Sequence, residues 1–209
     1  CALPILIAFD AGCFNGTINL SQLWNALLFI ARDAEQPSVL FSCDKSKLPE
    51  MYQTDNDYAT ILRFAIRSAL IDAVKIEGSL DEDDIDDIAG QAVDLGSVPI
   101  IVIRADQGAK ADELVQKMES RWDLQAKTFE LAVPVQTKED IQALEDAAKA
   151  FHEAHHDATV IPHPIGKIAK EAMLQGQTFG APLLYTTDGE ETETLPTSTA
   201  IHKLLHPEE

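Results

Sequence analysis

The sequence predicts an α/β protein in which parallel strands alternate with helices. Seven short apolar runs, rich in β-branched residues and bounded by turn residues, have the pattern of buried strands. Between them lie longer segments whose apolar residues repeat at the helical period, so each has one face to pack on a sheet. This order fits both a doubly wound sheet and a (β/α) barrel. No Gly-x-Gly-x-x-Gly or Walker lysine follows a strand, which disfavours a nucleotide-binding sheet and indicates no cofactor.

The first half of the chain contains four strand–helix pairs. The expected strands are Leu3–Asp10, Ser38–Cys43, Ala73–Glu77 and Val98–Arg104, and the helices that follow them are Asn19–Arg32, Asp57–Ile71, Asp84–Leu95 and Asp112–Trp122. In the first of these helices Leu20, Leu23 and Leu27 lie on one stripe, and comparable stripes run along the other three. We therefore expect all four helices to pack on the sheet.

The second half of the chain continues the same alternation. The expected strands are Lys127–Val133, Ala158–Ile161 and Pro182–Thr186, and the expected helices are Lys138–His152, Ile165–Leu174 and Thr199–Leu205. The acidic segment Thr186–Thr194, which follows the last strand, has the composition of a solvated loop. Because no linker or internal repeat separates these elements, we expect a single domain over residues 1–209.

The composition restricts the partners and the location of the protein. Lys and Arg number 16 against 35 Asp and Glu, which gives a formal net charge of −19. Nucleic acids and anionic membrane surfaces require cationic patches, so we expect neither as a partner. No apolar run reaches the roughly 18 residues that a membrane helix needs. Cys1, Cys13 and Cys43 are odd in number and lack metal-ligand spacing, so we expect reduced thiols in a cytoplasmic protein.

Several short segments together carry a resemblance to a known family. The most informative is the strand and helix opening over Phe129–Leu144. The others are Ile71–Glu77, Val98–Asp106, Gly166–Lys170, Thr178–Ala181 and Thr194–Ser198. In this order and spacing they resemble type I 3-dehydroquinate dehydratases over most of the chain, from about residue 37 to the C-terminus.

The resemblance implies a TIM-type (β/α)8 barrel. Counting back along the strands, Leu3–Asp10 falls at the second strand of the family, so we expect this chain to lack the first βα unit. A gap in a barrel exposes strand edges, which proteins usually cover. We therefore expect either a preceding segment or a homodimer.

The resemblance also implies where the chemistry of the family lies. Its members dehydrate 3-dehydroquinate through a Schiff base on a strand lysine, with a histidine as general acid and base. Glu130 stands at the position of that lysine and Ala105 at the position of the histidine. Glu77, which assists the histidine in the family, is the one clear match. Lys127 lies three residues from Glu130, and an odd offset along a strand points it to the opposite face.

The positions that hold the substrate in the family are substituted as well. Asp44 replaces an arginine, and Lys170 replaces the arginine of a Ser-Arg pair. Thr194 and Ser198 replace a serine and a glutamine. With Glu130, these changes make the expected site at the barrel mouth acidic, with Lys170 as its main positive group. An anionic ligand of the quinate type is therefore disfavoured.

Two kinds of function remain open. The first is a protein that has lost Schiff-base dehydratase activity and binds a small molecule at the barrel mouth, in a regulatory role. The second is an active lyase of the shikimate pathway, or an enzyme that uses carboxylates or a metal ion on the same barrel. The carboxylates expected at the barrel mouth suit a hard divalent cation, to which His163 could add a nitrogen ligand; they are Asp44, Glu77, Asp106 and Glu130. Ordinary ion pairing with Lys45, Arg104 or Lys170 is the simpler interpretation, and we assign no metal.

Overall fold

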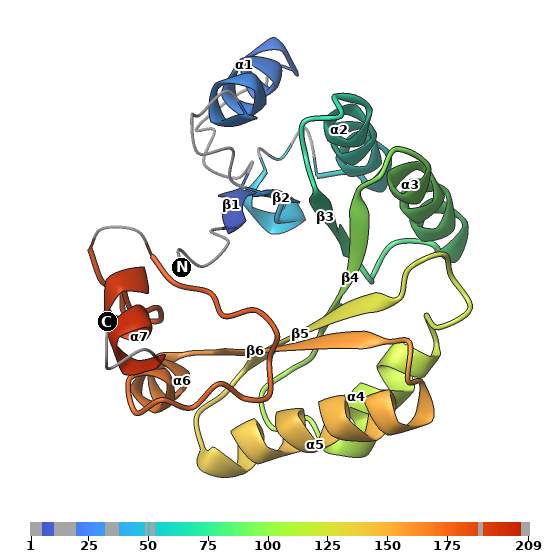
Figure 1. Ribbon diagram of the computed structural model, residues 1–209. Helices are drawn as coiled ribbons and strands as arrows, with labels where there is room; N and C mark the ends of the chain where they lie inside the picture. Colours follow the sequence, from blue (N-terminus) through green and yellow to red (C-terminus); the bar gives the residue numbers. More distant parts are fainter. Residues whose placement is uncertain are drawn as a thin grey trace. The chain divides into compact units, whose positions relative to one another are not determined.

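The computed structural model describes residues 6–10, 20–31, 38–48, 50, 53–187 and 190–205, in which strands and helices alternate (Figure 1). The elements are β1 Leu6–Asp10, α1 Leu20–Ala31, β2 Ser38–Ser42, the 3-10 helix η2 Lys45–Lys47, α2 Asp55–Arg67, β3 Ala73–Glu77, α3 Glu82–Asp94, β4 Val98–Arg104, α4 Ala111–Glu119, β5 Thr128–Pro134, α5 Lys138–Ala154, β6 Thr159–Ile165, α6 Lys167–Met173 and α7 Ser198–Leu205. All seven expected helices are confirmed, with ends that shift by a few residues. Within the described residues, six of the seven expected strands are also confirmed, again with shifted ends.

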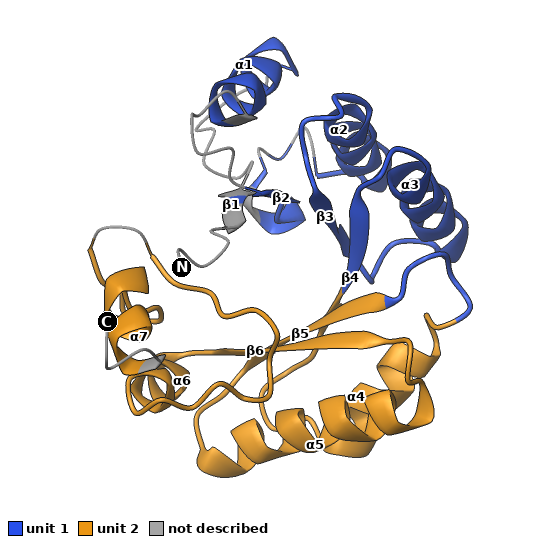
Figure 2. Cartoon of the chain, in the orientation of Figure 1, with its two compact units in different colours: residues 1–101, 123–127 blue, residues 102–122, 128–209 orange. Residues whose placement is uncertain are grey.

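The chain divides into two compact units (Figure 2). Unit 1 comprises Cys1–Ile101 and Asp123–Lys127, and unit 2 comprises Val102–Trp122 and Thr128–Glu209. Strand β4 contributes its first half to unit 1 and its second half to unit 2. Our expectation of one domain over residues 1–209 stays a prediction.

Unit 1 contains a parallel sheet in which β1 pairs with β2 and β2 pairs with β3. Leu40 and Phe41 of β2 each lie opposite a residue of both neighbouring strands, so β2 is the middle strand of the three. The apolar stripe of α1 is buried at Leu23 and Leu27, whereas Leu20 is exposed. Cys43 is buried and forms no disulfide within the described residues, and the other two cysteines lie outside those residues. None of the described helices is long and apolar enough to cross a membrane.

Helix α2 fixes the end of β3 in unit 1. The helix begins after Thr54, whose hydroxyl accepts a hydrogen bond from the backbone of Asp57 and so satisfies one free N–H of the first turn. On its buried face, Tyr58 is fully shielded from solvent, and its hydroxyl accepts the backbone N–H of Glu77 at 3.1 Å. The last residue of β3 is therefore held in place by a side chain of the helix that precedes the strand.

Unit 2 contains β5 and β6, which pair in parallel along their whole length from Thr128 opposite Thr159 to Pro134 opposite Ile165. Helix α5 packs on this pair of strands (Figure 1). Because strand side chains alternate, Phe129 faces the helix layer, and its ring lies 5.3 Å from that of Phe151 between centroids. The neighbouring residue, Glu130, therefore faces away from α5.

A capping box starts α5 immediately after β5. The Thr137 hydroxyl accepts the backbone N–H of Asp140, and the Asp140 carboxylate accepts the N–H groups of Thr137 and Gln136. The backbone hydrogen bond from Gln136 is the main reason that the pKa of Asp140 lies below its ordinary value. Burial raises this pKa by a smaller amount, and the hydrogen bond from Thr137 lowers it further. The charged carboxylate is the form that these bonds stabilise.

Replacing Asp140 with alanine is expected to lower the free energy of unfolding by about 1 kcal/mol near neutral pH, because two backbone donors lose their acceptor. Since the folded-state pKa is depressed, this contribution is complete above the ordinary aspartate pKa of about 4 and is lost as the pH falls through the folded value. Urea unfolding of both proteins at about pH 7 and pH 3 checks the expectation. A difference that persists unchanged at the lower pH would contradict it.

The expected strand at Pro182–Thr186 is wrong. The structure assigns no strand there, and the nearest pairing is an isolated bridge between Thr187 and Thr197. Pro182 has no backbone N–H to contribute to a ladder. The segment is attached to unit 2 by a side chain instead, since Tyr185 donates a hydrogen bond to Glu130 on β5.

Candidate functional site

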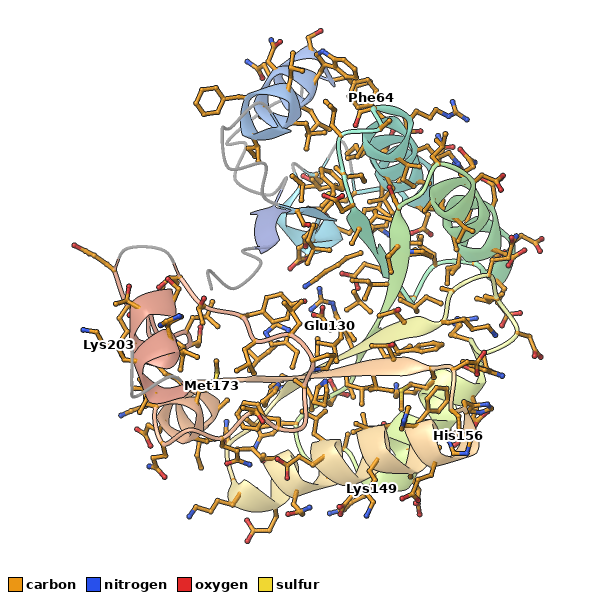
Figure 3. All side chains as sticks on the ribbon, in the orientation of Figure 1. Phe64, Glu130, Lys149, His156, Met173 and Lys203 are labelled. Atoms are coloured by element: carbon orange, nitrogen blue, oxygen red, sulfur yellow. The ribbon has the colours of Figure 1, made fainter. Side chains whose placement is uncertain are left out.

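Glu130 is a buried carboxylate in the middle of β5, with 2% of its surface exposed. It lies on the side of β5 and β6 opposite to α5, whose exposed side is marked by Lys149 (Figure 3). Register places Glu130 opposite Ile161, so the next same-face residue of β6 is His163. A buried carboxylate is costly unless hydrogen bonds satisfy its oxygens, and both oxygens of Glu130 have partners.

The first partner is the imidazole of His163, whose Nδ1 lies 2.9 Å from Glu130 Oε1. An ionised carboxylate only accepts hydrogen bonds, so in the neutral imidazole Nδ1 carries the proton and Nε2 holds the lone pair. The side chain of His163 is 21% exposed. In the part of the chain that the structure describes, Nε2 has no hydrogen-bond partner, and no side-chain nitrogen or oxygen is both buried and unpaired.

The second partner is the phenol of Tyr185, which donates to Glu130 Oε2 at 2.5 Å. The ring of Tyr185 also stacks on His163, with centroids 4.3 Å apart and planes tilted by 34°. Burial, followed by the charge of Glu130 and the hydrogen bond to it, raises the pKa of Tyr185 far above its ordinary value. The phenol therefore stays protonated and keeps its donor role.

The sequence does not reveal Tyr185 as a site residue, because its segment has the pattern of a buried strand. It does mark His163, but as a ligand for a metal rather than as a partner of Glu130. The contact depends on the register of β5 against β6, which no local pattern encodes. The sequence offers one signal for this contact, the alternation of side chains along each strand. Once the register is known, this alternation places Glu130 and His163 on the same face of the sheet.

The other expected site residues of unit 2 lie at strand ends and in loops. Ala105 follows β4 and is partly buried. Lys170 lies on α6, where its ammonium pairs with Glu191 at 2.5 Å and donates to the backbone oxygen of Thr192 at 2.5 Å. The positive group of the expected site is therefore attached to the acidic loop. The remaining two positions, Thr194 in that loop and Ser198 at the start of α7, are exposed.

Two expected site residues belong to unit 1. Glu77 ends β3 and is 8% exposed. Asp44 precedes η2, where its carboxylate accepts hydrogen bonds from the backbone and hydroxyl of Ser46. Lys45, the residue after Asp44, forms an ion pair with Asp55 at the start of α2, with 2.5 Å between Nζ and Oδ1. Because these residues and Glu130 lie in different units, the acidic grouping expected from the sequence stays a prediction.

The described residues contain no group of three or more His, Cys, Asp or Glu side chains that could hold a metal ion. Lys127 precedes β5 and is exposed, whereas Glu130 is buried. The expectation that the two side chains point to opposite faces stays a prediction.

Comparisons with known proteins identify the family. The family model described as type I 3-dehydroquinase matches residues 9–208. The chain belongs to the type I 3-dehydroquinase family. A 3-dehydroquinate dehydratase from Salmonella paratyphi B is 28% identical over 134 residues, which are 63% of this chain and 53% of that relative. The chain thus spans about half the length of the curated relatives it matches.

Solved structures give the fold of this type I 3-dehydroquinase-like chain. A type I 3-dehydroquinate dehydratase from Clostridium difficile, crystallised with covalently modified comenic acid, superimposes with a TM-score of 0.84 at 18% identity, over 99% of this chain and 82% of that one. The enzyme from Enterococcus faecalis gives 0.78 at 17% identity, over 98% and 82%. These likenesses confirm the expected TIM-type (β/α) barrel fold class.

Proposed function

We propose that this chain is a ligand-binding relative of the type I 3-dehydroquinases that no longer forms a Schiff base. An imine can form only from a neutral primary amine, and a carboxylate cannot take its place. The observation that carries the proposal is Glu130, a carboxylate at the position that the resemblance assigns to the reactive lysine. Its burial and its two hydrogen bonds give it a different role, namely holding His163 and Tyr185.

The state of the nearby amine supports the same proposal. Lys170 is the amine that the resemblance places closest to the substrate, but its ammonium is bound by Glu191 and by the Thr192 carbonyl. The ammonium is the donor in both contacts, so it presents no nucleophilic lone pair to a substrate. Ala105, at the position of the family histidine, has no group that could transfer a proton. A cytoplasmic location and a small-molecule ligand are parts of this proposal.

The test is an assay of purified protein with 3-dehydroquinate, followed by the ultraviolet absorbance of the conjugated product. We expect a rate equal to that of the buffer blank, because Glu130 and Ala105 stand where the family has its reactive lysine and its histidine. A 3-dehydroquinate dehydratase from Salmonella, assayed in parallel, is the positive control. Turnover that Lys170→Ala abolishes would contradict the proposal and would assign the chemistry to that amine.

A further inference from the structure

We propose that Nε2 of His163 is the hydrogen-bond acceptor for a hydroxyl group of a small, uncharged ligand, and that Glu130 is its positioning residue. The inference rests on the proposed function in one respect, namely that the protein binds a small molecule, and it adds the chemical class of that molecule. It goes further in assigning a ligand-contacting histidine to β6, at a position that is distinct from Ala105, where the family resemblance expects a histidine.

The geometry presents the correct nitrogen. The hydrogen bond of Nδ1 to Glu130 at 2.9 Å fixes both the tautomer and the orientation of the ring. Nε2 is thereby left as the lone-pair nitrogen, and it has no protein partner within the described residues. His163 is the fifth residue of β6 and lies two residues before its end. The carboxyl ends of the strands are where the active sites of TIM-type barrels are found.

The surroundings favour a hydrogen bond from a ligand hydroxyl to this nitrogen. The O–H bond stays intact, and the partial positive charge that the hydrogen bond places on the imidazole lies beside the Glu130 carboxylate, which stabilises it. Tyr185 restrains the ring from one side by stacking and holds the second oxygen of Glu130.

The charges indicate the class of ligand. Glu130 places a carboxylate within hydrogen-bond distance of the imidazole, and an anion at Nε2 would be repelled by it. Lys170, the positive group expected for a carboxylate ligand, is already paired with Glu191. A hydroxylated but uncharged molecule therefore suits the site better than its carboxylate counterpart.

His152 offers an internal comparison within unit 2. Its Nδ1 also makes a hydrogen bond of 2.9 Å, but the partner is the backbone carbonyl of Ala158. Both histidines therefore have Nε2 as the lone-pair nitrogen, and only His163 is oriented by a carboxylate. His152 is the more exposed of the two, so accessibility alone would make it the more reactive.

The experiment measures the acylation of each histidine by diethyl pyrocarbonate at about pH 8, where imidazoles are largely neutral, with peptide mass mapping. We expect His163 to react at least as fast as His152 in the wild-type protein. Removing the hydrogen-bond partner that orients a metal-binding histidine commonly lowers affinity or activity by about 10- to 100-fold. By the same reasoning, Glu130→Gln should lower the acylation rate of His163 at least about tenfold and leave the acylation rate of His152 unchanged. Tyr185→Phe, which leaves the bond to Nδ1 intact, should change the rate less than about threefold.

Equal slowing of the acylation of both histidines in Glu130→Gln, or no slowing at His163, would overturn the assignment.

Matched probes then test the ligand class: methyl quinate and quinate carry the same hydroxyls and differ in charge. We expect methyl quinate to protect His163 from acylation at a lower concentration than quinate does. The reverse order, or protection by neither, would overturn the ligand class. A Schiff-base adduct with 3-dehydroquinate would refute the proposed function without altering the reactivity of His163.

Discussion

Replacing Glu130 with alanine is expected to lower the free energy of unfolding by about 3–5 kcal/mol, which is a large share of the stability of a domain. The carboxylate is buried and accepts hydrogen bonds from His163 and Tyr185. Its removal leaves the Nδ1–H and the phenol without acceptors in a partly buried site, at a cost of about 1–3 kcal/mol each. The vacated volume adds a cavity term.

Glu130→Gln separates the loss of charge from the loss of volume. The amide keeps the shape of the side chain and one acceptor, so its variant should lose less stability than the alanine variant. Urea unfolding of the three proteins at one pH and salt concentration measures both differences. An alanine variant within about 1 kcal/mol of the wild type would contradict the assignment of Glu130 as the anchor of both partners.

Replacing Phe129 with alanine is expected to destabilise the protein by a similar amount, about 3–5 kcal/mol, for a different reason. Phe129 is fully buried on the helix-facing side of β5, with its ring centroid 5.3 Å from that of Phe151 and 6.3 Å from that of Trp122. Truncation removes apolar contact area and leaves a cavity that the surrounding aromatic rings cannot fill completely.

The two neighbouring substitutions are matched controls for each other. Phe129→Leu, which keeps most of the volume, should remain folded and should leave the acylation rate of His163 unchanged, whereas Glu130→Gln should reduce that rate. Thermal unfolding and peptide mapping of both variants supply the comparison. A loss of His163 reactivity in the Phe129 variant would show that reactivity follows general stability and not the Glu130 contact.

The sequence predicted most of the fold because its signals are local. The helical period and the strand-like runs placed the described helices and six of the described strands correctly. The expected strand at Pro182–Thr186 failed because β-branched and aromatic composition cannot distinguish a strand from an extended segment held by one side chain. Tyr185 provides that contact, and its partner lies 55 residues away in the chain.

The site was less predictable than the fold. The family resemblance pointed to Glu130 and identified the amine that it replaces, but it could not supply the new partners of the carboxylate. Those partners depend on the register that places His163 diagonally across from Glu130, and on the path of the chain that brings Tyr185 to the same carboxylate. Both are properties of tertiary structure, so they appear only when the strands are paired.

The most direct test of the central claim is the intact mass of the protein after incubation with 3-dehydroquinate and sodium borohydride, which reduces an imine to a stable secondary amine. A family member that retains the strand lysine, treated in the same way, shows that trapping works. The account predicts an unmodified mass for this chain, because Glu130 occupies the position that the resemblance assigns to the lysine. A borohydride-dependent adduct mapped to any lysine of the chain would contradict it.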